Sequence, residues 1–200
     1  VVAVSLAFSP TAYAAVYYID DTSSVGDLYT SGTNNGNDAN PGTNAFFPKR
    51  TLTNLLSTYN IGAGDRIYID TGSYSGTVRL NSSDADGTAA SPIRFIGPTN
   101  GAVAEFVGSG AAHGLVLSNA YNVQVQALTF RGYTTNGIRF LFSILGTTNC
   151  VFRGVTAKSN GRNGIQTLGT GVARNRFISN TLIGNGYQQY GIFFGPGVQN

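Results

Sequence analysis

The second half of this 200-residue chain repeats itself, and the repeat restricts the possible folds more than any other feature of the sequence. A glycine followed by an apolar, mostly alternating strand pattern recurs at spacings of 23, 27 and 27 residues, beginning at Gly114, Gly137, Gly164 and Gly191. A second strand series lies between these, at residues 128–132, 155–159 and 180–184. Asparagines mark a third in-phase position, at Asn122, Asn149 and Asn175.

Three in-phase series predict several short strands per repeat, separated by Asn and Gly corners. A leucine-rich repeat is excluded because its Leu pattern and helical half are missing, and a propeller blade needs about 40 residues. We therefore predict an all-β, right-handed parallel β-helix whose coils stack about 4.8 Å apart. Asparagine suits the corners because it tolerates left-handed backbone and can bond to its counterpart in the next coil.

The first half of the chain predicts an entry segment to this solenoid. Short strand patterns occur at residues 16–19, 66–70, 77–80 and 92–96. Residues 51–56 form the one plausible helix, a short one, with Thr51 or Thr53 as its N-cap. We expect residues 15–97 to cap the N-terminal end of the β-helix, and residues 98–200 to form regular coils that are truncated at the C-terminus.

Residues 1–14 carry no charge and end on the small-x-small triplet at residues 12–14, which is typical of a signal peptide that lacks its basic start. The alternative is a first buried strand. The apolar run is too short to span a bilayer, so we expect no membrane span and a secreted or cell-surface location. Cys150 is the single cysteine, and a small buried filler is favoured over a reactive thiol.

Charge is distributed asymmetrically along the chain. No Asp or Glu follows Glu105, whereas seven basic residues do: Arg131, Arg139, Arg153, Lys158, Arg162, Arg174 and Arg176. A basic exported surface predicts an acidic polysaccharide or a cell-envelope glycan as partner. Nucleic acid is disfavoured because the sequence has no aromatic-basic recognition motif.

Several motifs of the first half resemble the entry segment of pectate lyase-like right-handed β-helix proteins. They are the loop Asn-Asp-Ala-Asn-Pro-Gly-Thr at 37–43, the helix pattern at 52–56, the stretch Gly-Asp-Arg-Ile-Tyr-Ile at 64–69 and Gly-Ser-Tyr at 72–74. The resemblance implies the β-helix fold. It implies no single activity, since this segment precedes lyases, hydrolases, epimerases and non-catalytic surface proteins alike.

The later coils depart from the calcium-dependent members that they resemble. Those members carry clustered aspartates, often as Asn-x-x-Asp-Gly-Ile, whereas residues 160–165 read Asn-Gly-Arg-Asn-Gly-Ile, with Asn163 in place of the acid. Without acids beyond Glu105, these coils cannot build an all-oxygen Ca²⁺ site of the usual charge. No cofactor or metal site is evident, and we expect Ca²⁺ only through residues outside this fragment.

Candidate site residues come from the basic coils. Arg131 and Lys158 occupy matching strand positions, so they should stack one coil apart, where mutual repulsion would make the lysine a better base. Lys158 and Arg162 are the candidate catalytic residues. The candidate substrate-binding residues are Arg131, Arg153, Tyr133 and Tyr187, with Tyr190 as a further outward aromatic. A solvated face without function and a non-catalytic anion-binding strip are the alternatives.

Two functions fit these residues. The first is an exported or cell-surface β-helix that binds anionic polysaccharide and is non-catalytic in this fragment. The alternative is a pectate-like polysaccharide lyase that cleaves a uronate polymer by β-elimination, which needs a base and positive charge beside the substrate carboxylate. His113, the single histidine, lies in a sequence context that offers it no catalytic partner.

Overall fold

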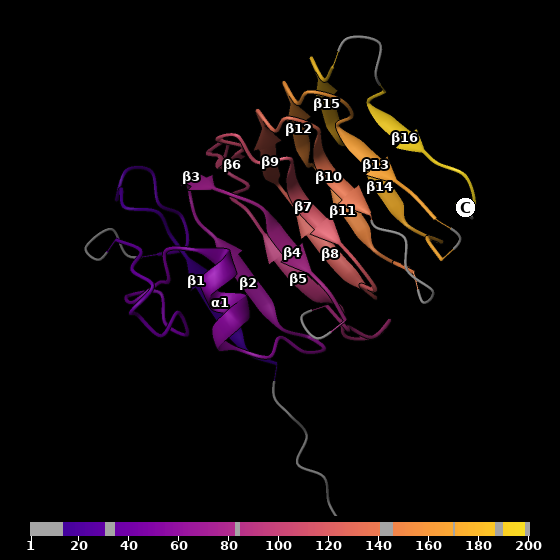
Figure 1. The fold of residues 1–200 in the computed structure, drawn as a ribbon. Helices are drawn as coiled ribbons and strands as arrows, with labels where there is room; N and C mark the ends of the chain where they lie inside the picture. Colours follow the sequence, from indigo (N-terminus) through magenta and orange to yellow (C-terminus); the bar gives the residue numbers. More distant parts are fainter. Residues whose placement is uncertain are drawn as a thin grey trace, which may run out of the picture.

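The computed structural model describes residues 14–30, 35–82, 85–140, 146–169, 171–186 and 190–198. Residues 1–13, which contain most of the predicted signal segment, lie outside this range, as does Tyr187. Over the described residues the chain forms a parallel β-helix with one short helix at its N-terminal end (Figure 1). The predicted fold class is therefore confirmed.

The strands of the described residues form three parallel sheets, which we name A, B and C. Sheet A contains β1 (Val16–Ile19), β2 (Arg66–Ile69), β5 (Ile93–Ile96), β8 (Val123–Gln126), β11 (Val151–Arg153) and β14 (Arg176–Ile178). Sheet B contains β3 (Gly72–Ser75), β6 (Ala104–Val107), β9 (Leu128–Arg131), β12 (Thr156–Lys158) and β15 (Thr181–Ile183). Sheet C contains β4 (Val78–Leu80), β7 (His113–Leu117), β10 (Asn136–Phe140), β13 (Ile165–Thr167) and β16 (Ile192–Phe194).

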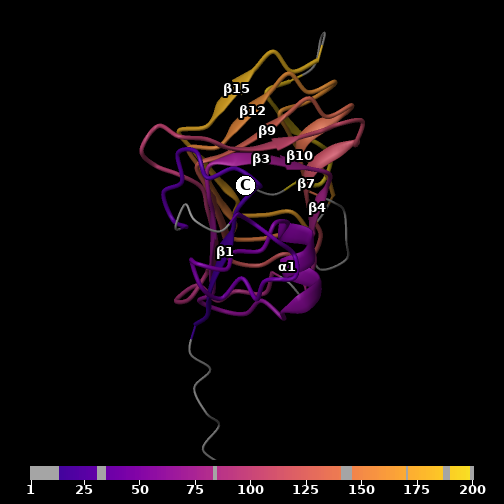
Figure 2. The same cartoon turned by 90° about the vertical axis from the view of Figure 1, so that its left-hand side faces the viewer.

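From β2 onward, each coil contributes one strand to each sheet in turn, so the solenoid has three sides (Figure 2). The predicted glycine series coincides with β7, β10, β13 and β16, and the series between them coincides with β9, β12 and β15. Register follows the sequence period: Ile138 pairs with Leu115 on one side and with Ile165 on the other. The repeat that defines the sequence therefore also defines the stacking.

The core is built from side chains that alternate inward along each strand. On sheet B the inward rings of Tyr74, Phe106 and Phe130 stack with centroids 5.2 and 5.3 Å apart. On sheet A the rings of Phe152 and Phe177 stack at 5.5 Å. Each large buried side chain stabilises the fold by roughly 1.5–3 kcal/mol through its removal from water. Parallel in-register stacking turns the sequence repeat into a continuous apolar column.

Helix α1 (Leu52–Thr58) closes the N-terminal end of that column. Of the two predicted caps, Thr51 is the one used, because its hydroxyl accepts a hydrogen bond from the Asn54 amide at 3.1 Å. Leu52 and Leu55 are buried in the same core as the strands. In the described part of the chain, no helix is long and apolar enough to cross a membrane.

The corners follow the asparagine prediction, with one correction. Asn122 and Asn149 have positive φ values of 53° and 57°. The third residue of this column is Arg174 (φ 55°) rather than Asn175, since the bridge between Thr148 and Ala173 sets the register. The next-coil asparagine bond is confirmed at a different corner, where Nδ2 of Asn160 donates to Oδ1 of Asn185 at 2.8 Å. Cys150, at the end of the Asn149 corner, is buried as predicted.

Candidate functional site

Arg131 and Lys158 pair in register on β9 and β12, as the sequence predicts. Both side chains reach back to Glu105 on β6. The Nε atom of Arg131 lies 2.6 Å from Oε2 of Glu105, and Nζ of Lys158 lies 3.1 Å from Oε1. The three side chains form an ion triad on the outer face of sheet B.

The sequence did not predict the acidic member of this triad. Burial raises the pKa of Glu105, but the hydrogen bonds and charges of Arg131 and Lys158 outweigh burial and lower it below the usual carboxyl value. Glu105 therefore stays ionised and neutralises one of the two positive charges. The prediction of a lysine base assumed two unpaired cations, whereas here both cations are paired with the same carboxylate.

The structure does not gather the other predicted cations beside Lys158. Arg153 lies on the exposed face of sheet A, at the end of β11. Arg162 is exposed in the turn before β13, where its amide bonds to the Thr135 carbonyl oxygen. The proposed base and its neighbours therefore lie on different parts of the coil.

The aromatic predictions have mixed outcomes. Tyr133 was expected to point outward, but it is only 1% exposed, and its hydroxyl donates to the Gly76 carbonyl oxygen at 3.0 Å. That prediction is wrong because the corner backbone turns the ring into the core, where burial raises the pKa of its hydroxyl. Tyr187 lies outside the described residues. Tyr190 is 58% exposed, and its ring centroid is 5.5 Å from that of Phe193.

Three arginines form an outward row along sheet A. Arg66 pairs in register with Arg94, and the row continues through Gln124 and Val151 to Arg176. In-register strands are about 4.8 Å apart, so Arg94 and Arg176 lie roughly 14 Å apart along the axis. Throughout the described residues, ion pairs form only at Glu105, so no acidic side chain neutralises this row.

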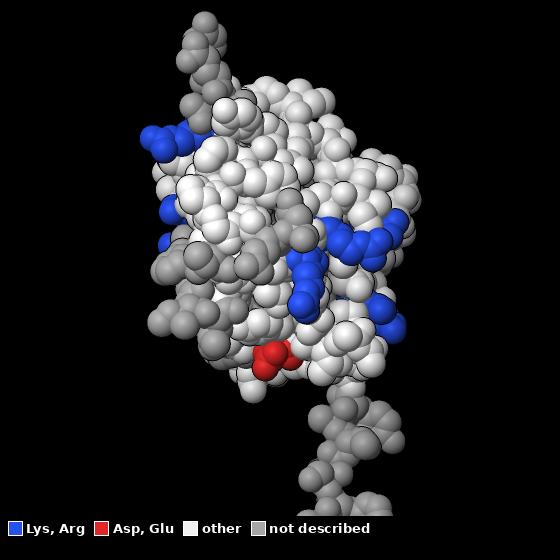
Figure 3. Space-filling view, turned by 90° about the vertical axis from the view of Figure 1, so that its right-hand side faces the viewer, with Lys and Arg blue, Asp and Glu red and all other residues white. Residues whose placement is uncertain are grey.

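A shallow groove runs beside the C-terminal part of this row. Its volume is about 280 Å³, slightly below the roughly 300–1,000 Å³ typical of ligand pockets. It is lined by Thr88, Ala89, Pro92, Asn122, Gln124, Asn149, Val151, Arg174 and Arg176. The side on which the last coils lie shows Lys and Arg side chains at several places, whereas acidic side chains are visible in one small area (Figure 3). The groove combines two guanidinium groups with neutral polar side chains.

Sequence reasoning identified Arg174 and Arg176 as part of a basic half but did not identify the groove. Its far wall comes from the loop at residues 88–92, which belongs to the acidic half of the sequence. The one signal for the groove in the sequence was that Arg174 and Arg176 lie two residues apart at the start of a strand.

His113 has partners, contrary to the expectation from its sequence neighbours. Its Nδ1 lies 2.8 Å from the Thr135 hydroxyl, and its Nε2 lies 2.8 Å from Nη1 of Arg139. Burial lowers the pKa of the imidazole, and the charges of Arg139 and Arg79 lower it further. The ring is therefore neutral near pH 7 and accepts a hydrogen bond from Arg139. This contact orients Arg139 on sheet C.

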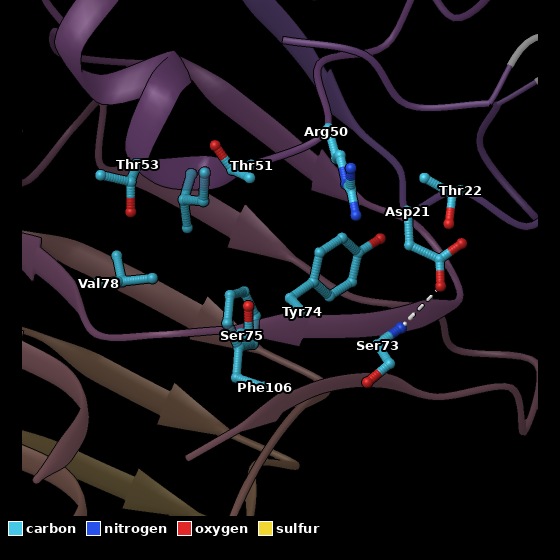
Figure 4. A pocket seen from close by; sticks show the side chains of 11 residues that line it. Asp21, Thr22, Arg50, Thr51, Thr53, Ser73, Tyr74, Ser75, Val78 and Phe106 are labelled. Atoms are coloured by element: carbon cyan, nitrogen blue, oxygen red, sulfur yellow. Dashed lines mark hydrogen bonds between the residues drawn. The ribbon is translucent and has the colours of Figure 1, made fainter. Parts of the chain in front are cut away.

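A second cavity lies beside α1 at the N-terminal end (Figure 4). Its volume of about 80 Å³ has room for a few water molecules but not for a sugar residue. The Ser73 amide donates to Oδ2 of Asp21 at 2.9 Å, and the Tyr74 hydroxyl donates to the Asp70 carbonyl oxygen at 2.8 Å. These hydrogen bonds join parts of the entry segment to one another.

A search of solved structures finds a crystal structure of pectate lyase Pel9A, with a TM-score of 0.57 and 14% sequence identity. The match covers 84% of this chain and 48% of that one, so this chain spans about half the length of Pel9A. This chain has the pectate lyase-like β-helix fold. At this identity the likeness establishes the fold and not the activity.

A rhamnogalacturonan lyase also resembles this β-helix, with a TM-score of 0.44 and 18% identity over 90% of this chain and 62% of that one. No family model and no curated protein matches the sequence. Among the described residues of the β-helix, no group of three or more His, Cys, Asp or Glu side chains is arranged to hold a metal ion.

Proposed function

We propose that this β-helix binds an anionic polysaccharide along the outer face of sheet A. The observation that carries the proposal is the arginine row with its groove, since Arg66, Arg94 and Arg176 face outward in register and no carboxylate pairs with them in the described residues. Guanidinium groups bind carboxylates through two parallel hydrogen bonds, which suits the acidic groups of a uronate polymer.

The geometry favours a polymer that lies along the solenoid axis. The row gives a cation or an amide on four of its five strands, with Val151 as the exception, and the strand spacing of about 4.8 Å is comparable with the length of one sugar residue. In the groove, Arg174 and Arg176 would bind carboxylates while Asn122, Gln124 and Thr88 would bond to hydroxyl groups. Binding would be sensitive to salt because most of these contacts are exposed.

The binding role is proposed as non-catalytic and extracellular. Lys158, the candidate base for β-elimination, is engaged by Glu105, and Arg162 does not lie beside it on sheet B. The extracellular location is supported by the sequence of residues 1–14, and the acidic polysaccharide or cell-envelope glycan remains the proposed partner. The lyase alternative is favoured by the fold shared with Pel9A, and it is tested in the same assay.

The test compares two double variants with the same loss of charge. Retention of the chain in gels that contain polygalacturonate measures binding. Arg174→Gln/Arg176→Gln should weaken binding about tenfold, whereas Arg131→Gln/Lys158→Gln should weaken it less than threefold, because Glu105 already engages both cations and neutralises one of their two charges. The reverse order would overturn the assignment to sheet A. The non-catalytic proposal would be overturned if ultraviolet absorbance showed that unsaturated products are released.

A further inference from the structure

Two aspartates lie side by side where β1 and β2 end. Ile19 and Ile69 pair in register, so Asp20 and Asp70 follow them as neighbours on adjacent parallel strands. Both are buried, with 1% and 0% of their surface exposed. The loop at residues 21–30 folds over this strand end, where its last three amides bond to Asp70. The loop carries two further carboxylates: Asp21, which accepts from the backbone amides of Ser23 and Ser73, and Asp27.

Asp70 is fully hydrogen-bonded by the backbone around it. Its Oδ1 accepts from the amides of Leu28 and Thr71, both at 2.7 Å. Its Oδ2 accepts from the amides of Tyr29 (2.7 Å) and Thr30 (2.6 Å) and from the Thr30 hydroxyl (2.9 Å). Five donors satisfy this carboxylate, and its oxygens are not free to bind a ligand.

Asp20 and Asp27 differ sharply from Asp70. Oδ2 of Asp20 is within 3.1 Å of the Thr30 hydroxyl, but Oδ1 of Asp20 is buried and has no hydrogen-bond partner. Both carboxylate oxygens of Asp27 are also buried and unpartnered. Neither residue is in an ion pair, since in the described part of the chain the ion pairs are those of Glu105.

Buried carboxylate oxygens without donors or counter-charge are costly, so something must compensate them. Asp27 is held at this strand end because the amide of the next residue, Leu28, donates to Asp70 at 2.7 Å. After burial itself, the charge of Asp27 is the strongest cause of the raised pKa of Asp20. Asp70 contributes to the same field, and Asp21 acts on Asp27. A cation with a preference for oxygen ligands matches three free carboxylate oxygens at a strand end.

We propose that Asp20 and Asp27 bind a Ca²⁺ ion that fastens the loop at residues 21–30 to the ends of β1 and β2. Asp20 supplies one oxygen and Asp27 supplies two, and water and backbone carbonyl oxygens complete the shell. Two free carboxylates make this a weaker site than one built from three or more acids, consistent with the millimolar-range affinities of extracellular calcium modules, roughly 10⁻⁴–10⁻³ M.

The test is thermal unfolding of the whole chain at pH 8, first in chelator and then with increasing CaCl₂. We expect the melting temperature to rise by several degrees, with half of the rise below about 1 mM Ca²⁺, and Mg²⁺ to have a smaller effect. Asp27→Asn should abolish the rise. Asp86→Asn, at an exposed carboxylate on a different loop, should retain it in full.

A second measurement covers the case in which Asp27→Asn does not fold. Tyrosine-sensitised Tb³⁺ luminescence of the unmodified chain should saturate with the metal and be displaced by Ca²⁺. Absence of both the luminescence and the calcium-dependent rise would overturn the proposal, leaving a proton shared by the two carboxylates as the compensation. Neither outcome tests polysaccharide binding by sheet A. That binding can be tested separately with chelator-treated protein.

Discussion

Oε2 of Glu105 accepts a hydrogen bond from Nε of Arg131 at 2.6 Å, and the other oxygen of the same carboxylate faces Lys158. The last acidic residue of the sequence thus contacts two cations of the acid-free half, one on each of two successive coils. This contact explains why the outer face of sheet B is a weaker anion-binding surface than its basic residues suggest. It leaves the arginines of sheet A as the main unneutralised positive charge that we assign to a polymer.

Replacing Glu105 by Gln should free both cations. We expect stability to fall by about 1 kcal/mol, since the triad is partly exposed, and retention by polygalacturonate to increase because sheet B gains a second charged strip. Denaturant unfolding and affinity gels measure the two effects. Unchanged retention together with reduced stability would show that sheet B contacts no polymer even when its cations are free.

The lowered pKa of Glu105 also sets a direction for stability against pH. Because its folded pKa lies below its unfolded value of about 4.5, the triad contributes stability above that pH and loses it as the pH falls further. The melting temperature of the native chain should therefore decline more steeply than that of Glu105→Gln between pH 5 and pH 3. Parallel curves for the two proteins would contradict the ion triad.

In the absence of a metal, Asp20 should make stability change with pH in the opposite direction. Burial, followed by the charge of Asp27, raises the pKa of Asp20 to about 7. The folded state then holds a proton that the unfolded state releases near pH 4, so stability is highest at low pH and falls as the pH rises toward 7. The loss should be on the order of a few kcal/mol in chelator. Asp20→Asn should flatten the curve.

Tyr133 should behave as a core residue and not as a sugar-binding residue. Tyr133→Ala should cost about 3–5 kcal/mol through the cavity that it leaves. Tyr133→Phe keeps the ring and loses the hydrogen bond to Gly76, so it should cost about 1 kcal/mol and leave polysaccharide retention unchanged. A loss of retention in a stably folded Tyr133→Phe protein would restore its predicted role.

Substitution of Asn160 should reduce stability far more than substitution of an exposed strand residue. The Asn160 side chain accepts from the Tyr133 amide at 3.1 Å and donates to Asn185 at 2.8 Å, so it joins adjacent coils. Asn160→Ala leaves buried polar groups unpaired and should destabilise the fold by about 2–3 kcal/mol. Thr181→Ala, at an exposed side chain, should change stability by less than about 0.5 kcal/mol in the same denaturant titration.

Much of this fold was predictable because a solenoid is nearly one-dimensional. Each coil contacts its neighbours at a constant offset in sequence, so residues that recur with the period must stack. The pairing of Arg131 with Lys158 and the stacking of the glycine series both follow from that offset. The capping helix was predictable from local signals, the Thr51 cap and the spacing of Leu52 and Leu55.

Contacts between residues that do not follow the sequence period could be identified only from the tertiary structure. Glu105 reaches Lys158 across an intervening strand, which only long side chains on one sheet allow. The direction of Tyr133 depends on the corner backbone, and the sheet A groove brings the loop at 88–92 against Arg174 and Arg176 from a later coil. The sequence by itself thus determined two of the three strands in each regular coil, their stacking and the sign of the charge. The tertiary structure decided which cations are neutralised and which carboxylates are left without donors, because side-chain reach and loop placement have no periodic signal.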